Sequence, residues 1–80
     1  MSKPLTIRAL WDDEARVWVA TSDDVPGLAT EADTVEALIA KLKTMIPELL
    51  DREGYGDGAD VPFRLVSEYN AVAHRRQAIA

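Results

Sequence analysis

The sequence predicts a small α+β domain with the order β-β-β-α-β, in which one long amphipathic helix packs on one face of a three-to-four-stranded, antiparallel-type sheet. The first observation is the stretch 34–51, where apolar residues recur at helical spacing along one side. The second is that the segments before and after it alternate apolar and polar residues, as half-buried strands do. A one-sided helix needs an apolar surface to lie on, and a small sheet provides it.

The first two strands are expected to form an antiparallel hairpin. Residues 5–11 alternate, with these side chains on one face: Leu5, Ile7, Ala9 and Trp11. Residues 12–15 are polar turn formers, and the second strand is expected over residues 16–21. Trp11 and Trp18 are the largest apolar surfaces in the chain, so we expect them to pack rather than to bind a ligand.

The stretch 22–27 interrupts the strand pattern. Pro26 fixes its own φ, and Gly27 can take the positive φ that a type II turn requires after proline. A short third strand over residues 28–32 then pairs with the second.

The helix is expected over residues 34–51. Its apolar stripe is Val35, Leu38, Ile39, Leu42, Met45, Ile46, Leu49 and Leu50. Thr34 is the better N-cap, and the alternative is Asp33 with Glu36 closing a capping box. Pro47 lies inside the stripe and removes the hydrogen bond to the carbonyl of Lys43, so we expect a kink, or a break followed by another turn.

The remainder is expected to form a loop, a fourth strand and a tail. Residues 54–58 are glycine-rich but lack the pattern of a phosphate loop. The fourth strand is expected over residues 61–69, and Pro62 near its start indicates an edge position. The tail has three interpretations: a helical turn, a continued strand or a mobile segment. The chain is thus one domain over residues 1–80, with a core of 5–70 and a tail of 71–80.

Composition narrows the class of protein. The net charge is −5 and there is no cysteine. The acidic balance argues against nucleic-acid binding by the main body. An acidic domain with a small basic cluster at residues 74–76 is suited to bind a basic partner. The simpler interpretation is a solvated surface that keeps a small domain soluble. Without a signal peptide or a long apolar segment, we expect a cytoplasmic protein with no membrane span.

The residue chemistry predicts no enzyme. His74 is the only histidine, and it lies beside Arg75 and Arg76, where a charged surface patch is the simpler interpretation. The acidic groups at residues 12–14 and 23–24 lack the spacing of a calcium loop and suit turns. We therefore expect no catalytic residue, no metal site and no cofactor.

The order of several short motifs resembles a known family. Residues 23–28 (DDVPGL) and 33–37 (DTVEA), together with the strands and the helix, resemble the N-terminal domain of HicB-type antitoxins. The whole chain is more closely similar to the stand-alone DUF1902 family, whose helix ends in a P-E-L-L run like residues 47–50. From this resemblance we assign only positions that define the fold: Asp24, Pro26, Gly27, Thr34 and Pro47. Ser22 departs from the proline-like turn chemistry that the antitoxins often show there.

The resemblance implies a partial ribonuclease-H-like or dsRBD-like topology without catalytic residues. HicB antitoxins bind and block HicA, a small RNA-cleaving toxin, and they oligomerise, so the implied partners are a HicA-like toxin and a second copy. Most carry a C-terminal DNA-binding domain, whereas only residues 70–80 follow the fourth strand here, which puts autoregulation by this chain alone in doubt.

Three hypotheses about function remain open at this point. The leading one is a HicB-like antitoxin, probed by binding to a small basic toxin. The second is a stand-alone dimeric scaffold or ligand-binding domain without a toxin, probed by sedimentation. The third is a degenerate nuclease or RNA binder, which predicts salt-sensitive affinity for RNA.

Overall fold

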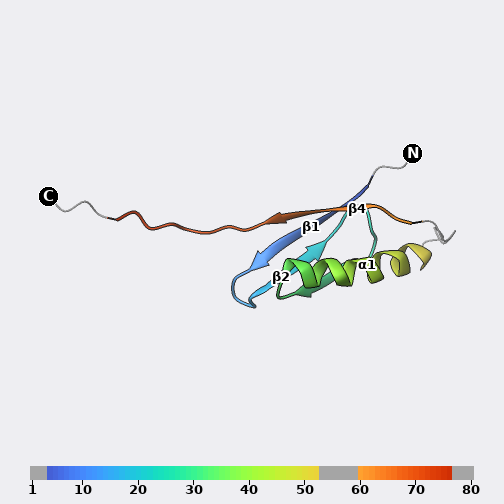
Figure 1. Ribbon diagram of the computed structural model, residues 1–80, viewed down its shortest axis with the longest axis horizontal. Helices are drawn as coiled ribbons and strands as arrows, with labels where there is room; N and C mark the ends of the chain where they lie inside the picture. The colour runs from blue at the N-terminus through green and yellow to red at the C-terminus, as the bar shows by residue number, and fades with distance from the viewer. Residues whose placement is uncertain (1–3, 53–59, 77–80) are drawn as a thin grey trace.

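The computed structural model describes residues 4–52 and 60–76 and has the predicted element order (Figure 1). The elements are β1 (Leu5–Asp12), β2 (Val17–Thr21), β3 (Ala29–Ala32), α1 (Val35–Arg52) and β4 (Phe63–Glu68). The α+β class and the single long helix are therefore confirmed. The glycine-rich stretch 54–58 lies outside the described residues.

The four strands form one sheet in the order β3-β2-β1-β4. β1 and β2 pair antiparallel, as do β2 and β3, whereas β1 and β4 pair parallel, so the sheet is mixed. A parallel partner cannot be reached through a tight turn, and the chain uses α1 as the crossover. β4 lies at the edge of the sheet, as Pro62 indicates.

Helix α1 covers one face of the sheet (Figure 1). The predicted stripe faces the strands: Leu38 and Leu42 are fully buried, and Ile46 nearly so. Beneath them lie small residues, since Ala9 and Ala20 are paired across β1 and β2 and both are buried. The whole buried cluster is Ile7, Ala9, Ala20, Val25, Leu28, Ala32, Leu38, Leu42, Ile46 and Leu50.

The β1–β2 turn differs from the prediction at Arg16, which was expected to begin the second strand. Arg16 has a φ of 60°, and its N–H donates to the carbonyl of Asp12 at 2.7 Å. The carboxylate of Asp12 also accepts the N–H groups of Glu14 and Ala15, at 3.0 and 3.1 Å. A left-handed residue is needed to close this turn, so β2 begins one residue later, at Val17.

The loop between β2 and β3 has the predicted turn and adds a buried residue. Gly27 has a φ of +82°, and the N–H of Leu28 donates to the carbonyl of Val25 at 3.2 Å, as a type II turn at Pro26-Gly27 requires. Val25 is fully buried, so the turn inserts its first residue into the core. This loop therefore contributes to the core as well as connecting two strands.

Asp24 ties the same loop to β1. Its carboxylate accepts the backbone N–H of Thr6 at 2.8 Å. Ser22 adds two bonds, because its hydroxyl donates to the carbonyl of Thr6 at 2.6 Å and accepts the N–H of Asp24 at 3.0 Å. β2 ends at Thr21, opposite Arg8, so these side chains replace the missing strand partner at Thr6.

Thr34 and Pro47 determine how α1 begins and continues. The hydroxyl of Thr34 accepts the N–H of Ala37 at 3.0 Å, so Thr34 is the N-cap rather than Asp33. The helix is not broken at Pro47, because it runs on to Arg52. Lys43 and Pro47 are both exposed, so the carbonyl of Lys43 that lacks an intrahelical partner lies on the solvent side.

We expect Leu42→Asp to abolish cooperative unfolding. The change removes a fully buried leucine and places an unpaired carboxylate against the sheet. Its cost is comparable to the whole free energy of unfolding, about 4–12 kcal/mol for a chain of this length. Thermal denaturation followed by circular dichroism measures this, with Thr44→Asp on the exposed side of α1 as the control. A Leu42→Asp melt close to that of the wild type would show that the helix face is assigned wrongly.

Asp24→Ala should weaken the fold modestly and locally. Losing one exposed, charge-assisted hydrogen bond costs about 1 kcal/mol, which corresponds to about 4–8 °C in Tm for a small domain. Hydrogen exchange at the Thr6 amide is the direct readout, because that N–H loses its acceptor. Asp23→Ala, on the same exposed loop, is the matched control. Unchanged protection of Thr6 in Asp24→Ala would contradict the assigned role.

Candidate functional site

The face of the sheet opposite α1 is not covered by any described element (Figure 1). Side chains alternate between the two faces along each strand, and this alternation determines which residues lie on the uncovered face. We call this surface the open face. Its residues are Thr6, Arg8 and Leu10 of β1, Val17, Val19 and Thr21 of β2, Ala29 and Glu31 of β3, and Arg64, Val66 and Glu68 of β4. Charged and apolar groups alternate across this surface.

The strand register brings apolar side chains together on the open face. Leu10 pairs with Val19 of β2, while Val66 of β4 lies opposite Arg8, diagonally from Leu10. Leu10 is 50% exposed and Val66 is 45% exposed, which is high for such large apolar side chains. Larger exposed apolar patches mark interaction sites, so this pair is a candidate centre for one.

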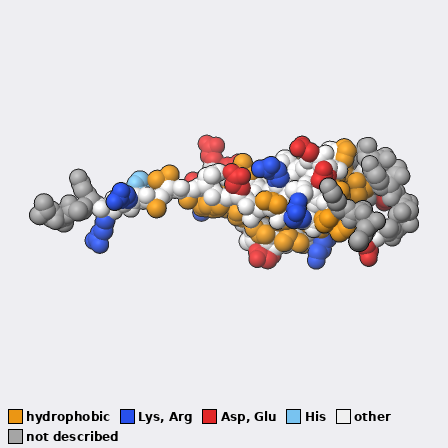
Figure 2. Space-filling model, turned by 90° about the horizontal axis from the view of Figure 1, so that it is seen from above, with side chains coloured by type: hydrophobic (Ala, Val, Ile, Leu, Met, Phe, Trp, Pro, Cys, Tyr) orange, Lys and Arg blue, Asp and Glu red, His pale blue; other side chains and the backbone are white. Residues whose placement is uncertain are grey.

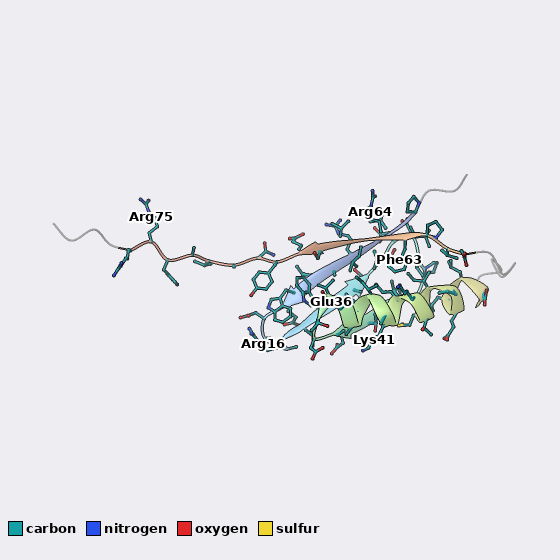
Figure 3. All side chains as sticks on the ribbon, viewed as in Figure 1. Arg16, Glu36, Lys41, Phe63, Arg64 and Arg75 are labelled. Carbon is teal, nitrogen blue, oxygen red and sulfur yellow. The ribbon has the colours of Figure 1, made fainter. Side chains whose placement is uncertain are left out.

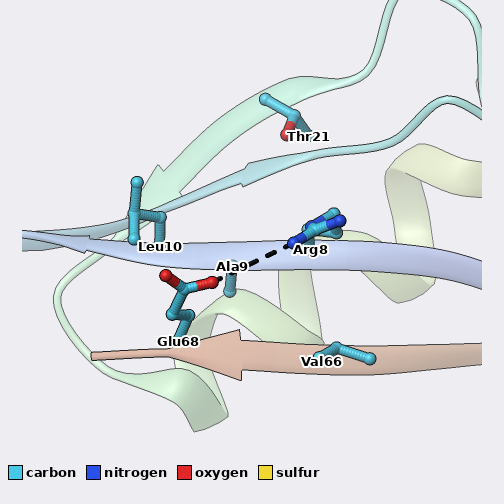
Figure 4. Close-up of a pocket in the computed structure, with 6 residues that line it drawn as sticks. All are labelled: Arg8, Ala9, Leu10, Thr21, Val66 and Glu68. Atoms are coloured by element: carbon cyan, nitrogen blue, oxygen red, sulfur yellow. Dashed lines mark ion pairs between the residues drawn. The ribbon is translucent and has the colours of Figure 1, made fainter. Parts of the chain in front are cut away.

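Between β1 and β4 the open face is slightly hollowed (Figure 4). The hollow has a volume of about 170 Å³ and is lined by Arg8, Ala9, Leu10, Thr21, Val66 and Glu68. Arg8 and Glu68 form an ion pair across it, with 3.9 Å between the guanidinium nitrogen and the carboxylate oxygen. Both side chains are more than half exposed, so the pair contributes little stability. The hollow is smaller than usual small-ligand sites.

A second hollow lies at the start of β1, beside Pro4, Leu5, Thr6, Asp24 and Arg64. Its polar groups are already bonded to one another: Asp24 accepts from Thr6, and the Arg64 guanidinium donates to the Thr6 hydroxyl at 3.0 Å. These bonds hold the loop after β2 and the start of β4 against β1. The polar groups of this hollow therefore have a structural role.

Three aromatic rings lie together where β1 and β4 end and β2 begins. Trp11 and Trp18 are partners in the β1–β2 register, with ring centroids 5.4 Å apart in an edge-to-face arrangement. Tyr69 stacks on Trp11 at 5.7 Å and lies 6.0 Å from Trp18. The guanidinium of Arg16 lies 5.3 Å from the centre of the Trp11 ring. The packing predicted for both tryptophans is thus confirmed.

Residues 70–76 form an extended segment, which we call the C-terminal arm. Of the three interpretations from sequence, the helical turn does not hold over residues 70–76: these residues have no helix and leave the sheet in the direction of β4 (Figure 1). Every arm residue is exposed, and Val72 is 81% exposed. The radius of gyration is 16.9 Å, where about 11–12 Å is expected for a compact chain of this length.

The arm carries the basic cluster away from the body of the molecule. Arg75 lies far from Arg16 and Arg64 in Figure 3, and the basic tip of the arm is separate from the acidic side chains of the body in Figure 2. His74 is exposed on the arm, as a surface patch requires. The arm is thus a basic, extended element on an acidic domain.

The acidic groups singled out from sequence have local structural roles. Asp12 caps its turn, and Asp13 accepts from Arg16 at 2.8 Å. Among the described residues there is no group of three or more histidine, cysteine, aspartate or glutamate side chains that could hold a metal ion. Within the same ranges, no helix is long and apolar enough to cross a membrane.

Of the five motif residues, Asp24 borders the open face, since it lines a hollow with Thr6 and Arg64, and the others lie on the loop before β3 or at α1. Asp24, Pro26 and Gly27 shape the loop before β3, Thr34 begins α1, and Pro47 lies on the exposed side of α1. The exposed pair Leu10 and Val66 was not identified from sequence. The sequence feature that could have identified it is Leu10, a large apolar residue on a strand face whose other residues, Thr6 and Arg8, are polar.

Comparisons with known proteins agree with this fold. A solved structure, the crystal structure of a hypothetical protein from the extremely thermophilic bacterium Thermus thermophilus, is 52% identical in sequence with a TM-score of 0.65. The match covers 91% of this chain and 100% of that one. No curated protein matches the chain. The pattern of DUF1902, a domain of unknown function, matches residues 4–77, and the chain therefore belongs to the DUF1902 family.

Proposed function

We propose that this chain is a non-catalytic interaction module of the HicB antitoxin type, which binds and neutralises a small RNA-cleaving toxin. The proposal also includes a homodimer, a cytoplasmic location and no cofactor. Its support is the motif order from Asp24 to Pro47 and the exposed apolar groups on the open face. The toxin would bind the open face.

The observation that carries the proposal is the exposure of Leu10 and Val66 on the same face, diagonally across the β1–β4 pair. Protein interfaces combine apolar groups with charged and polar groups. On the open face the ion pair of Arg8 and Glu68 lies on the other diagonal, and Glu31 and Arg64 lie further out. A rigid sheet can present such a surface without rearranging.

Charge favours a basic partner. The chain has a net charge of −5. An enzyme that cleaves RNA must approach phosphates, and such proteins carry basic surfaces. An acidic domain therefore attracts a protein of this kind at long range and competes with its RNA.

Binding to a co-encoded small basic protein, measured by calorimetry and by growth rescue in cells expressing that protein, tests the proposal. We expect Leu10→Asp and Val66→Asp each to weaken binding at least about tenfold, because a charge replaces an apolar group at the centre of the interface. Ala40→Asp, on the exposed side of α1, is the matched control and should bind normally. The antitoxin role is wrong if no co-encoded basic protein binds the wild-type chain.

The alternative is a stand-alone dimeric scaffold or ligand-binding domain without a toxin partner. The observation in its favour is the C-terminal arm, which is exposed over residues 70–76. The two functions separate cleanly, since the scaffold self-associates but does not rescue growth. The rescue assay decides between them, because sedimentation of the chain alone reports self-association, which both functions include.

A further inference from the structure

The C-terminal arm makes no backbone hydrogen bond within the described part of the chain. At its root, the Asn70 side chain makes only a long contact with Glu68, at 3.4 Å. Backbone N–H and C=O groups are strong hydrogen-bonding groups, and an extended segment offers them in the pattern that another strand requires. A partner strand would supply these bonds and so offset the conformational entropy that fixing the backbone of the segment costs.

The outer edge of β4 offers the matching surface. β4 is the last strand in the order β3-β2-β1-β4, so within the described residues its second edge has no strand partner. β4 has six residues, Phe63–Glu68, and the arm adds residues 70–76 in the same direction. The chain therefore has one nearly continuous extended run over residues 63–76.

We propose that two copies of this chain exchange their arms, each arm pairing antiparallel with the outer edge of β4 in the other copy. A two-fold axis near Tyr69 produces both contacts at once, as a closed symmetric dimer requires. The arm continues straight from β4, so no bend is needed (Figure 1). The exchange specifies the homodimer included in the proposed function and is independent of any toxin.

Side-chain alternation selects the register. With Tyr69 opposite its own copy, Val66 of one chain lies opposite Val72 of the other, which brings together two exposed apolar side chains. Shifting the arm by two residues in one direction places Arg64 opposite Arg76, where like charges repel. A shift the other way places Arg64 opposite Val72 and leaves Val66 opposite Asn70. The register centred on Tyr69 is therefore preferred.

The ends and the charges of the arm agree with this register. Arg76 falls opposite Pro62, which has no N–H to donate and so interrupts the ladder there. The net charge of −5 includes the two arginines of the arm, which leaves −7 on the remainder. Each basic arm would thus lie on an acidic body, with Asp60 two residues beyond Pro62.

Cysteine cross-linking tests the proposal directly, since the natural chain contains no cysteine. In a chain carrying Val66→Cys and Val72→Cys, the two positions are about 20 Å apart along one extended strand, too far for an internal disulfide. Opposite residues of paired antiparallel strands lie within disulfide range. We therefore expect mild oxidation to convert most of this variant to covalent dimer on a non-reducing gel.

The controls separate arm exchange from chance collisions and from other docking sites. Thr44→Cys with Val72→Cys tests collision with the exposed side of α1, and it should remain monomeric on the gel. Glu31→Cys with Val72→Cys tests docking at the β3 edge instead. Preferential cross-linking of the Glu31 pair, or equal cross-linking of all three variants, would overturn the proposal.

Sedimentation equilibrium of the purified chain supplies the second test, with no toxin present. Val72→Asp places a carboxylate against Val66 of the other copy and should raise the dimer Kd at least about tenfold. Val72 is 81% exposed in the single chain, so the fold of each copy should be unaffected. Ala40→Asp adds the same charge on the exposed side of α1 and is the matched control. A wild-type chain that stays monomeric at micromolar concentration, or a Val72→Asp dimer of wild-type strength, would rule out arm exchange while leaving toxin binding open.

Discussion

The contact between α1 and one face of the sheet is the interaction on which the rest of the structure depends. Leu38, Leu42 and Ile46 are buried against a sheet whose centre is made of the paired alanines Ala9 and Ala20. Small residues on the sheet and large residues on the helix fill the space between the layers without polar groups. The parallel pairing of β1 and β4 also depends on this contact, because α1 is the crossover that brings β4 back to the sheet.

The same contact explains which surfaces remain available. The described residues contain one helix, α1, and it covers one face of the sheet. The other face keeps Leu10 and Val66 exposed among charged side chains, and the outer edge of β4 has no strand partner within the described residues. The thin core thus makes association with another protein physically favourable, since association buries apolar surface that the fold leaves in water.

The two proposed contacts share Val66 but otherwise use different parts of the sheet, and they can coexist. Arm exchange uses the edge of β4 and would join the two sheets through backbone hydrogen bonds, whereas a toxin would bind the side chains of the open face. An edge-to-edge dimer extends the open face rather than covering it, because sheet faces and sheet edges point in perpendicular directions. Dimerisation would therefore give a toxin a wider surface with Val72 from the other copy at its margin.

The sequence by itself determined the element order, the helix face, the Thr34 cap and the Pro26-Gly27 turn, because each depends on local periodicity or on one residue's conformational limits. Local patterns could not show that β4 pairs parallel with β1, that Val25 enters the core, or that Asp24 replaces a strand partner for Thr6. Only the tertiary structure decided these points, because they depend on which distant segments meet. The direction of the arm is the clearest case, since a segment such as residues 70–76 becomes a strand only where another backbone satisfies its hydrogen bonds.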